Sequence, residues 1–591
     1  MKKQTLILDT EIYRDYYLAS FLNVETGRCR HFEMFDGQAI DDATIRTILR
    51  QYRVVTFNGN NFDIPLLTVA LGGADCAKIK SLSDRIIKNN LKPWAIGLES
   101  IRCDHIDLIE VAPGIASLKI YGGRLHCQKL QDLPIEPDAS ISPELRPLLR
   151  EYCENDLRTT LALFRKLEAQ IQLREKMTAE YGVDLRSKSD AQIAEAVIKH
   201  EVEKITRRKP EEEDPLRLAG QTFNYRIPDF IQACGEPLRH AINIVGAATF
   251  TIASNGTVQM PKEVADLKIQ IGSSTYRMGI GGLHSSEKST AHFSDNQNVL
   301  IDRDVASYYP AIILNCGLRP AHIGENFTSV YRTIVNRRLS AKRLKDTVTA
   351  DSLKITINGS FGKFGSPYSS LYSPTLLIQT TVTGQLSLLM LIEMLESEGI
   401  AVVSANTDGI VIKCPREKLN LCEFVVWEWE HVTGFQTEAT EYQAIYSRDV
   451  NNYIAIKKEG VKVKGVYAPA ALQKNPTNEI VTTAVIKFIQ QGVPVEETIA
   501  ECDDITKFVT VRTVKGGAVD QGGNYLGKAI RWYHAVGIAG PITYKVNGYT
   551  VPRSEGARAL MQLPEAFPDD VDFQWYVDET HSILKDIGAI K

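Results

Sequence analysis

The sequence lacks the cysteine spacing of a zinc site or of a disulfide framework. Its ten cysteines are scattered along 591 residues, and no two of them form Cys-x-x-Cys. Scattered cysteines are typical of reduced thiols in the cytosol. We therefore expect a cytoplasmic protein.

Membrane and targeting signals are also missing. No uninterrupted apolar run is long enough to cross a bilayer, and the start MKKQTLILDTEIY reaches Asp9 before a signal-peptide core could form. The chain has no internal repeat and no low-complexity tract. We expect no membrane partner. Because the chain is too long for one hydrophobic core, we expect several domains.

Neither sign of charge dominates. Lys and Arg together number 68 and Asp and Glu 72, which gives a net charge of −4. This balance does not exclude a nucleic-acid partner, because a nuclease or polymerase keeps carboxylates at its metal ions and confines its positive charge to a channel. Composition alone leaves the function open.

Two segments near the N-terminus place acidic side chains at the ends of predicted strands. TLILDTE is typical of a buried strand on which Asp9 and Glu11 point to the same side. RVVTFNGNNFDIPLL is a second β-branched run, which breaks at Asn58-Gly59 and delivers Phe62 and Asp63.

A later segment predicts a helix with Ser142 as its N-cap, and this helix carries Tyr152 and Asp156 at i and i+4, on one face. Singly, each acid of these segments is a cap or a surface residue. Together, four carboxylates suit two Mg²⁺ ions, because hard cations take oxygen ligands and paired ions stabilise both oxygens that exchange in phosphodiester hydrolysis. Tyr152 would orient the attacking water.

These segments resemble the three motifs of the proofreading 3′–5′ exonuclease domain of family B DNA polymerases. The resemblance implies that Asn58 and Phe62 hold a single-stranded 3′ end, a role suited to an aromatic platform. Lys129 is a loose match to the family's additional exonuclease lysine. The matching patterns are Asp9-x-Glu11, Asn58-x-x-x-Phe62-Asp63 and Tyr152-x-x-x-Asp156, in which the acids are the implied metal ligands and Tyr152 an implied catalytic group.

The segment NVLIDRDVASYYPAIILN predicts a strand, then Asp304, then a turn that ends at Tyr309-Pro310. It resembles polymerase motif A, Asp-x-x-Ser-Leu-Tyr-Pro, with Tyr308 in place of leucine. The resemblance implies that Asp304 binds both catalytic metal ions and that the Val305 carbonyl binds one. It also implies that Tyr309 lies under the incoming sugar and excludes a 2′-hydroxyl.

The segment DSLKITINGSFGKFG resembles motif B, Lys-x-x-x-Asn-Ser-x-Tyr-Gly. Lys354, Asn358 and Phe361 would lie on one helical face and meet the triphosphate and the nascent base pair. Gly359 replaces the family's serine, and Phe361 replaces its tyrosine.

Just upstream, YRTIVNRRLSAKRLKD predicts a basic amphipathic helix with Arg338 and Lys342 one turn apart. A run of charge is usually a solvated face. Its place before motif B resembles the family's fingers hairpin, which implies contacts with the triphosphate. Lys342 is the stronger candidate of the two.

The segment SANTDG lies between two β-branched runs and predicts a hairpin tip. It resembles motif C, Tyr-x-Asp-Thr-Asp-Ser, in which the second aspartate, here Asp408, is the metal ligand. Asn406 stands for the first aspartate, Ser404 for the tyrosine and Gly409 for the serine. With Asp304, Asp408 would complete a two-carboxylate centre for phosphoryl transfer.

Weaker matches frame this centre in the family's order. RMGIGGLHSSE resembles the Tyr-x-Gly-Gly linker without its tyrosine, RDVNNYIAI resembles Lys-x-Tyr with Asn451 in place of the lysine, and KVKGVY follows. Alone, each is a common turn or strand. The implied DNA contacts are Gly281, Gly282, Thr407, Tyr453, Lys464 and Gly465.

The resemblance implies an α/β multidomain protein with an RNase H-like exonuclease domain and a right-hand polymerase whose palm has an antiparallel sheet. The expected bounds are exonuclease 1–185, palm 186–310 and 366–480, fingers 311–365 and thumb 481–591. NYLGKAIRWYHAVG, with Lys528 and Arg531 beside Trp532 and Tyr533, is either a groove-tracking element of the thumb or part of its core.

The spacing of the motifs predicts a compact viral, phage-like type. Only 50 residues separate Asp304 from Lys354 and 54 separate Lys354 from Asp408, too few for both insertions of protein-primed members, and Asp9 leaves no room for the N-terminal domain of large cellular members. We expect a monomer in the host cytoplasm that extends an ordinary primer. Its implied ligands are primer–template DNA, dNTPs and two Mg²⁺ ions per site, with Mn²⁺ as an alternative. Its accessory partner would be a helicase, single-strand-binding protein or processivity factor.

Two other functions are weighed against a proofreading polymerase. In one, only the exonuclease works and the polymerase half is a DNA-binding platform, because motif C is eroded. In the other, the chain is a non-catalytic replication scaffold, which would have no need for six metal-facing acids in two sites.

Overall fold

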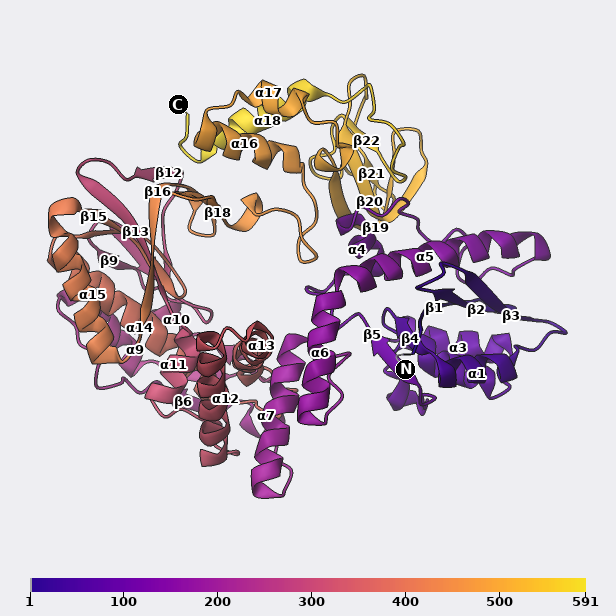
Figure 1. Cartoon of the computed structure of the whole chain (residues 1–591), viewed down its shortest axis with the longest axis horizontal. Helices are drawn as coiled ribbons and strands as arrows, with labels where there is room; N and C mark the ends of the chain where they lie inside the picture. Colours follow the sequence, from indigo (N-terminus) through magenta and orange to yellow (C-terminus); the bar gives the residue numbers. More distant parts are fainter. Residues whose placement is uncertain (1–2, 591) are drawn as a thin grey trace.

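The computed structural model describes residues 3–590, whose elements fall into three groups, at the right, left and top of Figure 1. The first group is built on a five-stranded sheet in the order β3-β2-β1-β4-β5. Strand β1 runs antiparallel to β2 and parallel to β4, and β4 runs parallel to β5. The strands are β1 Thr5–Ile12, β2 Tyr16–Asn23, β3 Cys29–Phe35, β4 Arg53–Thr56 and β5 Asp104–Asp107.

Helices surround this sheet because a parallel pair needs a crossover connection. They are α1 Asp42–Gln51, α2 Asp63–Leu71, α3 Cys76–Ile87, α4 Leu118–Arg124 and α5 Arg146–Lys166. The long helix predicted from Ser142 begins later than expected. Ser142 precedes a short 3₁₀ turn and makes no side-chain capping bond, and α5 starts at Arg146 with Pro147 in its first turn.

Two helices, α6 (Glu168–Tyr181) and α7 (Asp190–Thr206), lead from the first group to the second. Helix α7 starts at a capping box formed by Ser189 and Gln192 and packs against α12 (Glu325–Arg343) and α13 (Thr347–Phe364). The predicted helices around Arg338 and Lys354 are therefore present as α12 and α13.

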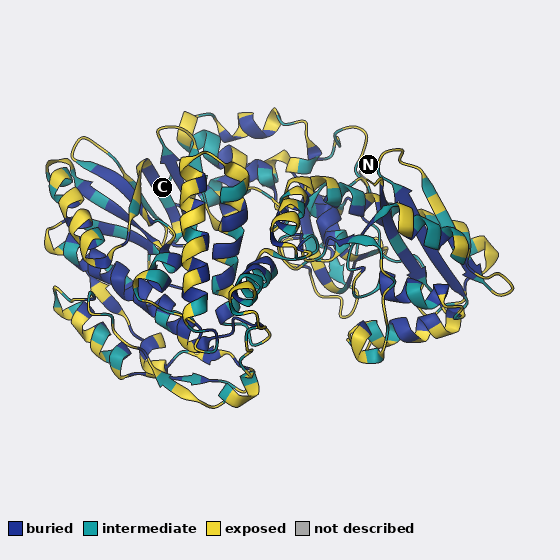
Figure 2. Ribbon diagram, turned by 60° about the horizontal axis from the view of Figure 1, so that its bottom comes forward, coloured by how far each residue is buried: buried dark blue, intermediate teal, exposed yellow. Residues whose placement is uncertain are grey.

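The second group is built on a ten-stranded sheet in the order β18-β17-β16-β13-β15-β14-β11-β10-β9, with β12 paired to β16, and its printed pairings are antiparallel. Its central strands are dark blue, and so buried, in Figure 2. The strands are β9 Ile269–Ile271, β10 Ser274–Arg277, β11 His284–Ser285, β12 Thr290–Phe293, β13 Asn298–Val305, β14 Ala401–Asn406, β15 Gly409–Pro415, β16 Thr437–Asp449, β17 Asn452–Lys457 and β18 Val461–Val463. The three strands β6 Thr222–Asn224, β7 Thr249–Ile252 and β8 Val258–Gln259 form a separate small sheet.

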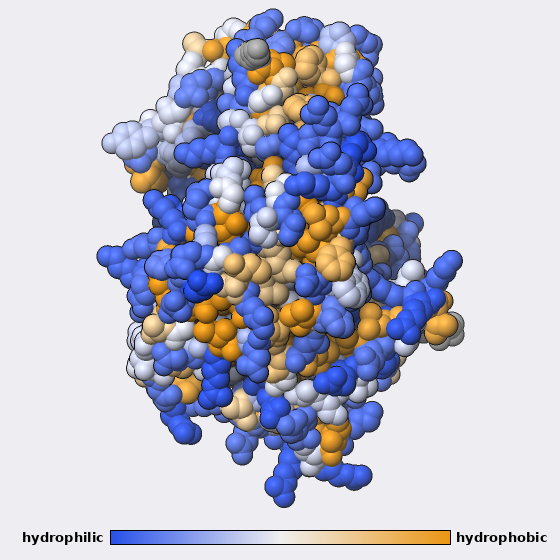
Figure 3. Space-filling view, turned by 90° about the vertical axis from the view of Figure 1, so that its left-hand side faces the viewer, coloured by the Kyte–Doolittle hydropathy of each residue, from blue (hydrophilic) through white to orange (hydrophobic). Residues whose placement is uncertain are grey.

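Helices α9 (Glu236–Ala247), α11 (Tyr308–Asn315), α14 (Pro374–Ser397) and α15 (Leu419–Thr433) pack around the larger sheet. The turn expected to end at Tyr309-Pro310 is instead the first turn of α11. Helix α15, at the left of Figure 1, exposes Phe424 and Trp427, and Figure 3 shows apolar and hydrophilic side chains interspersed on that side of the molecule.

Helix α14 alone, among the described residues, is long and apolar enough to cross a membrane by length and composition. It is not an uninterrupted apolar run, since Gln385 and Glu393 interrupt it. In the fold, 83% of its apolar window is buried inside the protein. Gln385 exchanges hydrogen bonds with the Gly279 backbone. Glu393 accepts from the Leu238 N–H of α9 and from the Cys234 and Gly235 N–H groups just before it. It is the core helix of the second group.

The third group combines helices with a four-stranded sheet, β21-β19-β20-β22. Lys528 and Arg531 lie on strand β20, where their odd spacing sends their side chains to opposite faces. Trp532 and Tyr533 are buried, so the core alternative is confirmed for both. The elements are α16 Glu479–Gln491, α17 Val495–Ala500, β19 Thr510–Val519, β20 Tyr525–His534, β21 Thr543–Tyr544, β22 Ala557–Ala559 and α18 Phe573–Asp586.

Two candidate metal centres

The first centre lies where β1, α2 and α5 meet. Asp9 and Glu11 come from β1, Asp63 is the first residue of α2, and Asp156 and Tyr152 come from α5. Ligand atoms of Asp9, Glu11 and Cys153 lie within 4.8 Å of one another. Asp63 accepts a 2.6 Å hydrogen bond from the Thr10 hydroxyl. The fold therefore brings together the four acids that the sequence motifs single out.

These carboxylates are buried and repel one another, and both effects raise their pKa values. Burial raises the pKa of Asp9 well above its usual value, and the charges of Asp63 and Asp156 raise it further. Burial likewise raises the pKa of Glu11 and takes that of Asp63 to about 7. A crowded set of buried carboxylate oxygens is the donor set that Mg²⁺ or Mn²⁺ prefers, so these residues fit a divalent cation.

The lysine of this centre is Lys119 of α4, which the sequence analysis missed. Its Nζ donates to the Tyr152 hydroxyl over 2.5 Å and lies 3.4 Å from an Asp132 oxygen. Lys129, the residue singled out from the sequence, instead pairs with the exposed carboxylate of Glu151. Lys119 is the second residue of a seven-residue helix, and nothing in its sequence neighbourhood marks it for this role.

A second missed residue, Asp107, holds the loop that carries Asn58. It is fully buried at the end of β5, and it accepts the backbone N–H groups of Asn58 at 2.7 Å and Asn60 at 2.9 Å. Asn58 has a left-handed backbone conformation with φ 67°, and these two hydrogen bonds to Asp107 stabilise it. Phe62 then precedes α2 as its partly exposed N-cap residue.

The second centre lies on the hairpin of β14 and β15. Asp304 of β13 is paired with Gly409, and the Val305 N–H donates to the Asp408 carbonyl at 2.8 Å. The turn consists of Thr407 and Asp408, and Thr407 adopts φ 60°, a strained conformation for a β-branched residue. The predicted hairpin tip is thus present and holds Asp408 beside Asp304.

Asp302 and Lys462 enlarge this centre beyond the motif residues. Asp302 lies two residues before Asp304 on β13, is buried, and accepts hydrogen bonds from Lys462 Nζ at 2.7 Å and from Tyr442. Lys462 Nζ also lies 3.4 Å from Asp304. Burial raises the pKa of Asp304 and Asp408, and for Asp304 the charge of Asp302 adds to this effect. This donor set also fits a divalent cation.

A cavity of about 400 Å³ adjoins Asp408 and gathers most of the predicted nucleotide contacts. The Tyr309 and Phe361 rings stack in it with centroids 4.2 Å apart. Arg338 is buried and donates to the Ser307 hydroxyl at 2.9 Å, whereas Lys342 is exposed and does not line the cavity. Arg338 is therefore the better placed of the two. The lining comprises Val305, Ser307, Tyr308, Tyr309, Pro310, Arg338, Lys354, Ile357, Asn358, Phe361 and Asp408.

The residues of the weaker matches also lie beside the hairpin. Asn406 donates to the Val450 carbonyl at 2.9 Å and to the Asn451 side chain at 3.1 Å. The Thr407 N–H donates to the Leu283 carbonyl, next to Gly282, and Tyr309 donates to the Gly281 carbonyl. Lys464 Nζ lies 5.9 Å from the Tyr453 ring centroid, and Gly465 follows Lys464 in the chain.

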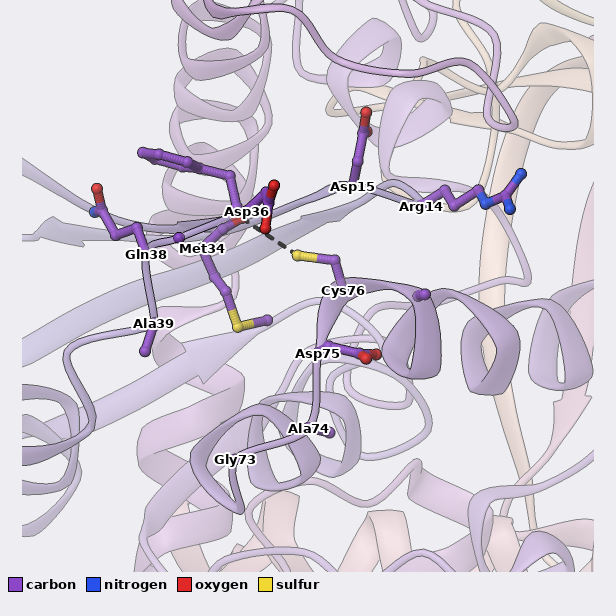
Figure 4. A pocket seen from close by; sticks show the side chains of 13 residues that line it. Arg14, Asp15, Met34, Asp36, Gln38, Ala39, Gly73, Ala74, Asp75 and Cys76 are labelled. Carbon is purple, nitrogen blue, oxygen red and sulfur yellow. Dashed lines mark hydrogen bonds between the residues drawn. The ribbon is translucent and has the colours of Figure 1, made fainter.

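A separate cavity of about 480 Å³ lies on the first group between the β3 and α3 ends (Figure 4). Three of its polar side chains have partners in the fold. Cys76 faces the Met34 carbonyl, Asp75 caps α3 through the Lys78 N–H, and Asp15 accepts the Ile141 N–H. None of the residues of either centre lines it.

Comparison with known proteins gives a partial sequence match and distant structural matches. No protein-family model matches the chain. A stretch of 174 residues is 29% identical to DNA polymerase 1 of Aeropyrum pernix, which covers 28% of this chain and 17% of the archaeal protein. Part of the chain is thus related to a DNA polymerase. A structure of the family B DNA polymerase from Pyrobaculum calidifontis superposes with 14% identity and a TM-score of 0.42, over 100% of this chain and 79% of that one, a likeness too low to compare individual parts.

Proposed function

We propose that this chain is a family B DNA-directed DNA polymerase with a 3′–5′ proofreading exonuclease. One observation carries the proposal: a single chain holds two separate carboxylate centres, and the second adjoins a cavity lined by Tyr309, Lys354, Asn358 and Phe361. A scaffold would have no use for such an arrangement. Several of these residues are supplied by elements far apart in the sequence.

The domain assignment belongs to the same proposal. The strand order and directions of the first sheet support an RNase H-like exonuclease domain. The ten-stranded antiparallel sheet corresponds to the palm, α12 and α13 to the fingers, and the third group to the thumb. Helix α7, within the bounds expected for the palm, packs against α12 and α13, and this packing supports counting it with the fingers.

In the polymerase centre, Asp304, Asp408 and the Val305 carbonyl would hold two Mg²⁺ ions, and Mn²⁺ would serve in their place. Such ions activate the primer 3′-hydroxyl and neutralise charge on the phosphates during nucleotidyl transfer. Lys354 and Arg338 supply positive charge at the triphosphate, Asn358 contacts the nucleotide, and the stacked Tyr309 and Phe361 confine its sugar and base.

In the exonuclease centre, Asp9, Glu11, Asp63 and Asp156 would hold the ions, and Tyr152 would orient the water that attacks the terminal phosphodiester. Phe62 and Asn58 hold the unpaired 3′ end. The Lys119 ammonium fixes the Tyr152 oxygen and offsets part of the surrounding negative charge.

The proposal includes a compact viral, phage-like type that works as a monomer in the host cytoplasm. Between Asp304 and Lys354 the described chain forms only α11, α12 and the start of α13, and between Lys354 and Asp408 only the rest of α13, α14 and β14. These short intervals support extension of an ordinary primer. A helicase, single-strand-binding protein or processivity factor would supply what a compact enzyme lacks.

The test uses a 5′-labelled primer on a longer template with Mg²⁺, with and without dNTPs. We expect extension with dNTPs and shortening without them. Asp304→Asn should abolish extension and spare shortening, and Asp9→Asn should do the reverse.

Shortening in both lanes would favour the alternative, an exonuclease whose polymerase half only binds DNA. If Asp304→Asn and Asp9→Asn each removed both activities, the division into two sites would be refuted. If the wild-type chain did neither, the enzyme proposal would be rejected.

A further inference from the structure

Strand β20 of the third group reaches the exonuclease centre of the first group. The Tyr525 hydroxyl, at the start of β20, donates to Asp132 Oδ2 at 2.9 Å. The other oxygen of Asp132 lies 3.4 Å from Lys119 Nζ, and Lys119 donates to Tyr152 at 2.5 Å. A continuous chain of polar contacts therefore runs from the third group to the tyrosine beside the carboxylates.

The contacts along this chain hold the Tyr152 hydroxyl in one orientation. Because an ammonium only donates, Lys119 occupies a lone pair of the Tyr152 oxygen, and the hydroxyl proton must point away from Lys119, where Asp156 is its acceptor. Lys119 also lies 4.9 Å from the Tyr152 ring centroid. Asp132 and Lys119 side chains are 23% and 22% exposed, so their attraction is only partly screened by water.

The third group is fastened at this point by further contacts. The Leu130 N–H donates to the Met561 carbonyl at 2.7 Å, and Arg531 donates to the Cys127 carbonyl at 3.0 Å. A Cβ added at Gly527 would lie 2.8 Å from the Asp132 Cβ. Strand β20 therefore lies so close to Asp132 that only a glycine fits at this position. On the far side of Tyr525, Lys545 Nζ lies 4.4 Å from its ring centroid.

We propose that Tyr525, Asp132 and Lys119 are positioning residues for the exonuclease, and that docking of β20 sets the orientation of Tyr152. This inference rests on the exonuclease function proposed above and adds to it a dependence on the third group. Excision of a 3′ nucleotide would then be fastest when β20 is seated against Asp132.

The test measures excision from a 5′-labelled single-stranded oligonucleotide with Mg²⁺ over a range of DNA concentrations. Tyr525→Phe removes only the hydroxyl and keeps the ring over Lys545. We expect kcat to fall about fivefold with KM unchanged, which corresponds to about 1 kcal/mol, the typical net contribution of one hydrogen bond. Asp132→Asn should give a larger fall, of about tenfold or more, because it also removes the partner of Lys119.

Three controls separate positioning from other roles. Tyr549→Phe, on an exposed tyrosine of the same group, should leave excision unchanged. Both Asp132→Asn and Tyr525→Phe should extend a primer at the wild-type rate, which reports correct folding. The double variant should be no slower than Asp132→Asn alone, because both changes break one chain.

Several results would overturn the inference. Wild-type excision rates in both variants would do so, as would a raised KM with unchanged kcat in Tyr525→Phe, which would make Tyr525 a DNA contact. Effects that multiply in the double variant would also refute a single chain. Absence of excision by the wild-type enzyme, by contrast, would reject the exonuclease function itself.

Discussion

At the residue scale, the atoms around Gly359, Gly409 and Asn406 explain why these residues differ from the motifs of family B polymerases. A Cβ at Gly359 would lie 2.5 Å from the Asp190 carbonyl oxygen, because α13 packs closely on the start of α7. A Cβ at Gly409 would collide with the Asp304 carboxylate. Asn406, in turn, contacts Asn451, so the two residues that replace an acid and a lysine form a neutral pair.

Restoring the family's serine at Gly359 should destabilise the protein. Gly359→Ser must push the backbone at the start of α7 away, and overpacking of this kind costs about 1–3 kcal/mol. Gly362→Ser is the matched control on the same helix, since nothing lies within 4 Å of its added Cβ. Denaturant unfolding compares the two variants with the wild type. Equal stability of both variants would show that α7 moves freely.

The contact between Asn406 and Asn451 predicts that a second substitution will restore the primer-extension rate lost by the first. Asn406→Asp replaces the amide donor with an oxygen that faces the Val450 carbonyl and the Asn451 side-chain oxygen, which should slow extension about tenfold. Adding Asn451→Lys supplies a donor and should restore most of the rate. Primer-extension rates of the two single variants and the double variant test this. Losses that multiply would mean that the two residues act independently.

At the scale of elements, buried Arg531 joins β20 to the first group. It is fully buried and donates to the carbonyls of Leu560, Cys127 and Gln128, and burial lowers its pKa to about 10. The groove-tracking role considered for Arg531 is wrong, because the side chain faces carbonyl groups inside the protein. Strand β20 therefore joins the third group to the first group through the hydrogen bonds of Arg531.

Removing the Arg531 hydrogen bonds should weaken the contact between the third group and the first group. Arg531→Met removes one donor from each of three carbonyls, of which the Gln128 carbonyl keeps the Leu563 N–H. The cost is about 2 kcal/mol, which corresponds to a roughly 30-fold larger population of the locally open state. Hydrogen exchange at the Leu130 and Leu563 amides, which cross between the groups, would report it. Arg512→Met, on a partly exposed arginine of β19 that donates to the Pro552 carbonyl within the third group, is the control. Unchanged exchange in Arg531→Met would mean that the remaining contacts suffice.

The local elements could be predicted from the sequence, and the contacts between them could not. The strand before Asp304, the hairpin at Asp408 and the helix of Lys354 follow from periodicity and turn chemistry within a few residues. Lys119 reaches Tyr152 from 33 residues away, and Lys462 reaches Asp304 from 158. No local pattern marks such partners, because tertiary packing alone brings them together.

At the scale of the whole molecule, a buried histidine makes stability depend on pH. His534 is 2% exposed, stacks on Trp575 with centroids 3.4 Å apart, and donates from Nδ1 to the Glu555 carbonyl. Burial lowers its pKa from 6.5 to about 4. The unfolded chain therefore binds a proton between these values while the folded chain does not, so stability falls as the pH falls from 6.5 toward 4.

Replacing His534 should therefore flatten the acid side of the stability profile. Between pH 7 and pH 5, the wild type should lose about 2 kcal/mol more than His534→Gln, by the linkage of a shifted pKa to the free energy of unfolding. Urea unfolding at the two pH values measures the difference, which cancels the contributions of the carboxylates common to both proteins. His240→Gln, on an exposed histidine, should keep the wild-type slope. Parallel profiles for wild type and His534→Gln would mean that His534 accepts its second proton at Nε2 without unfolding, through a rearrangement that lets water reach that nitrogen.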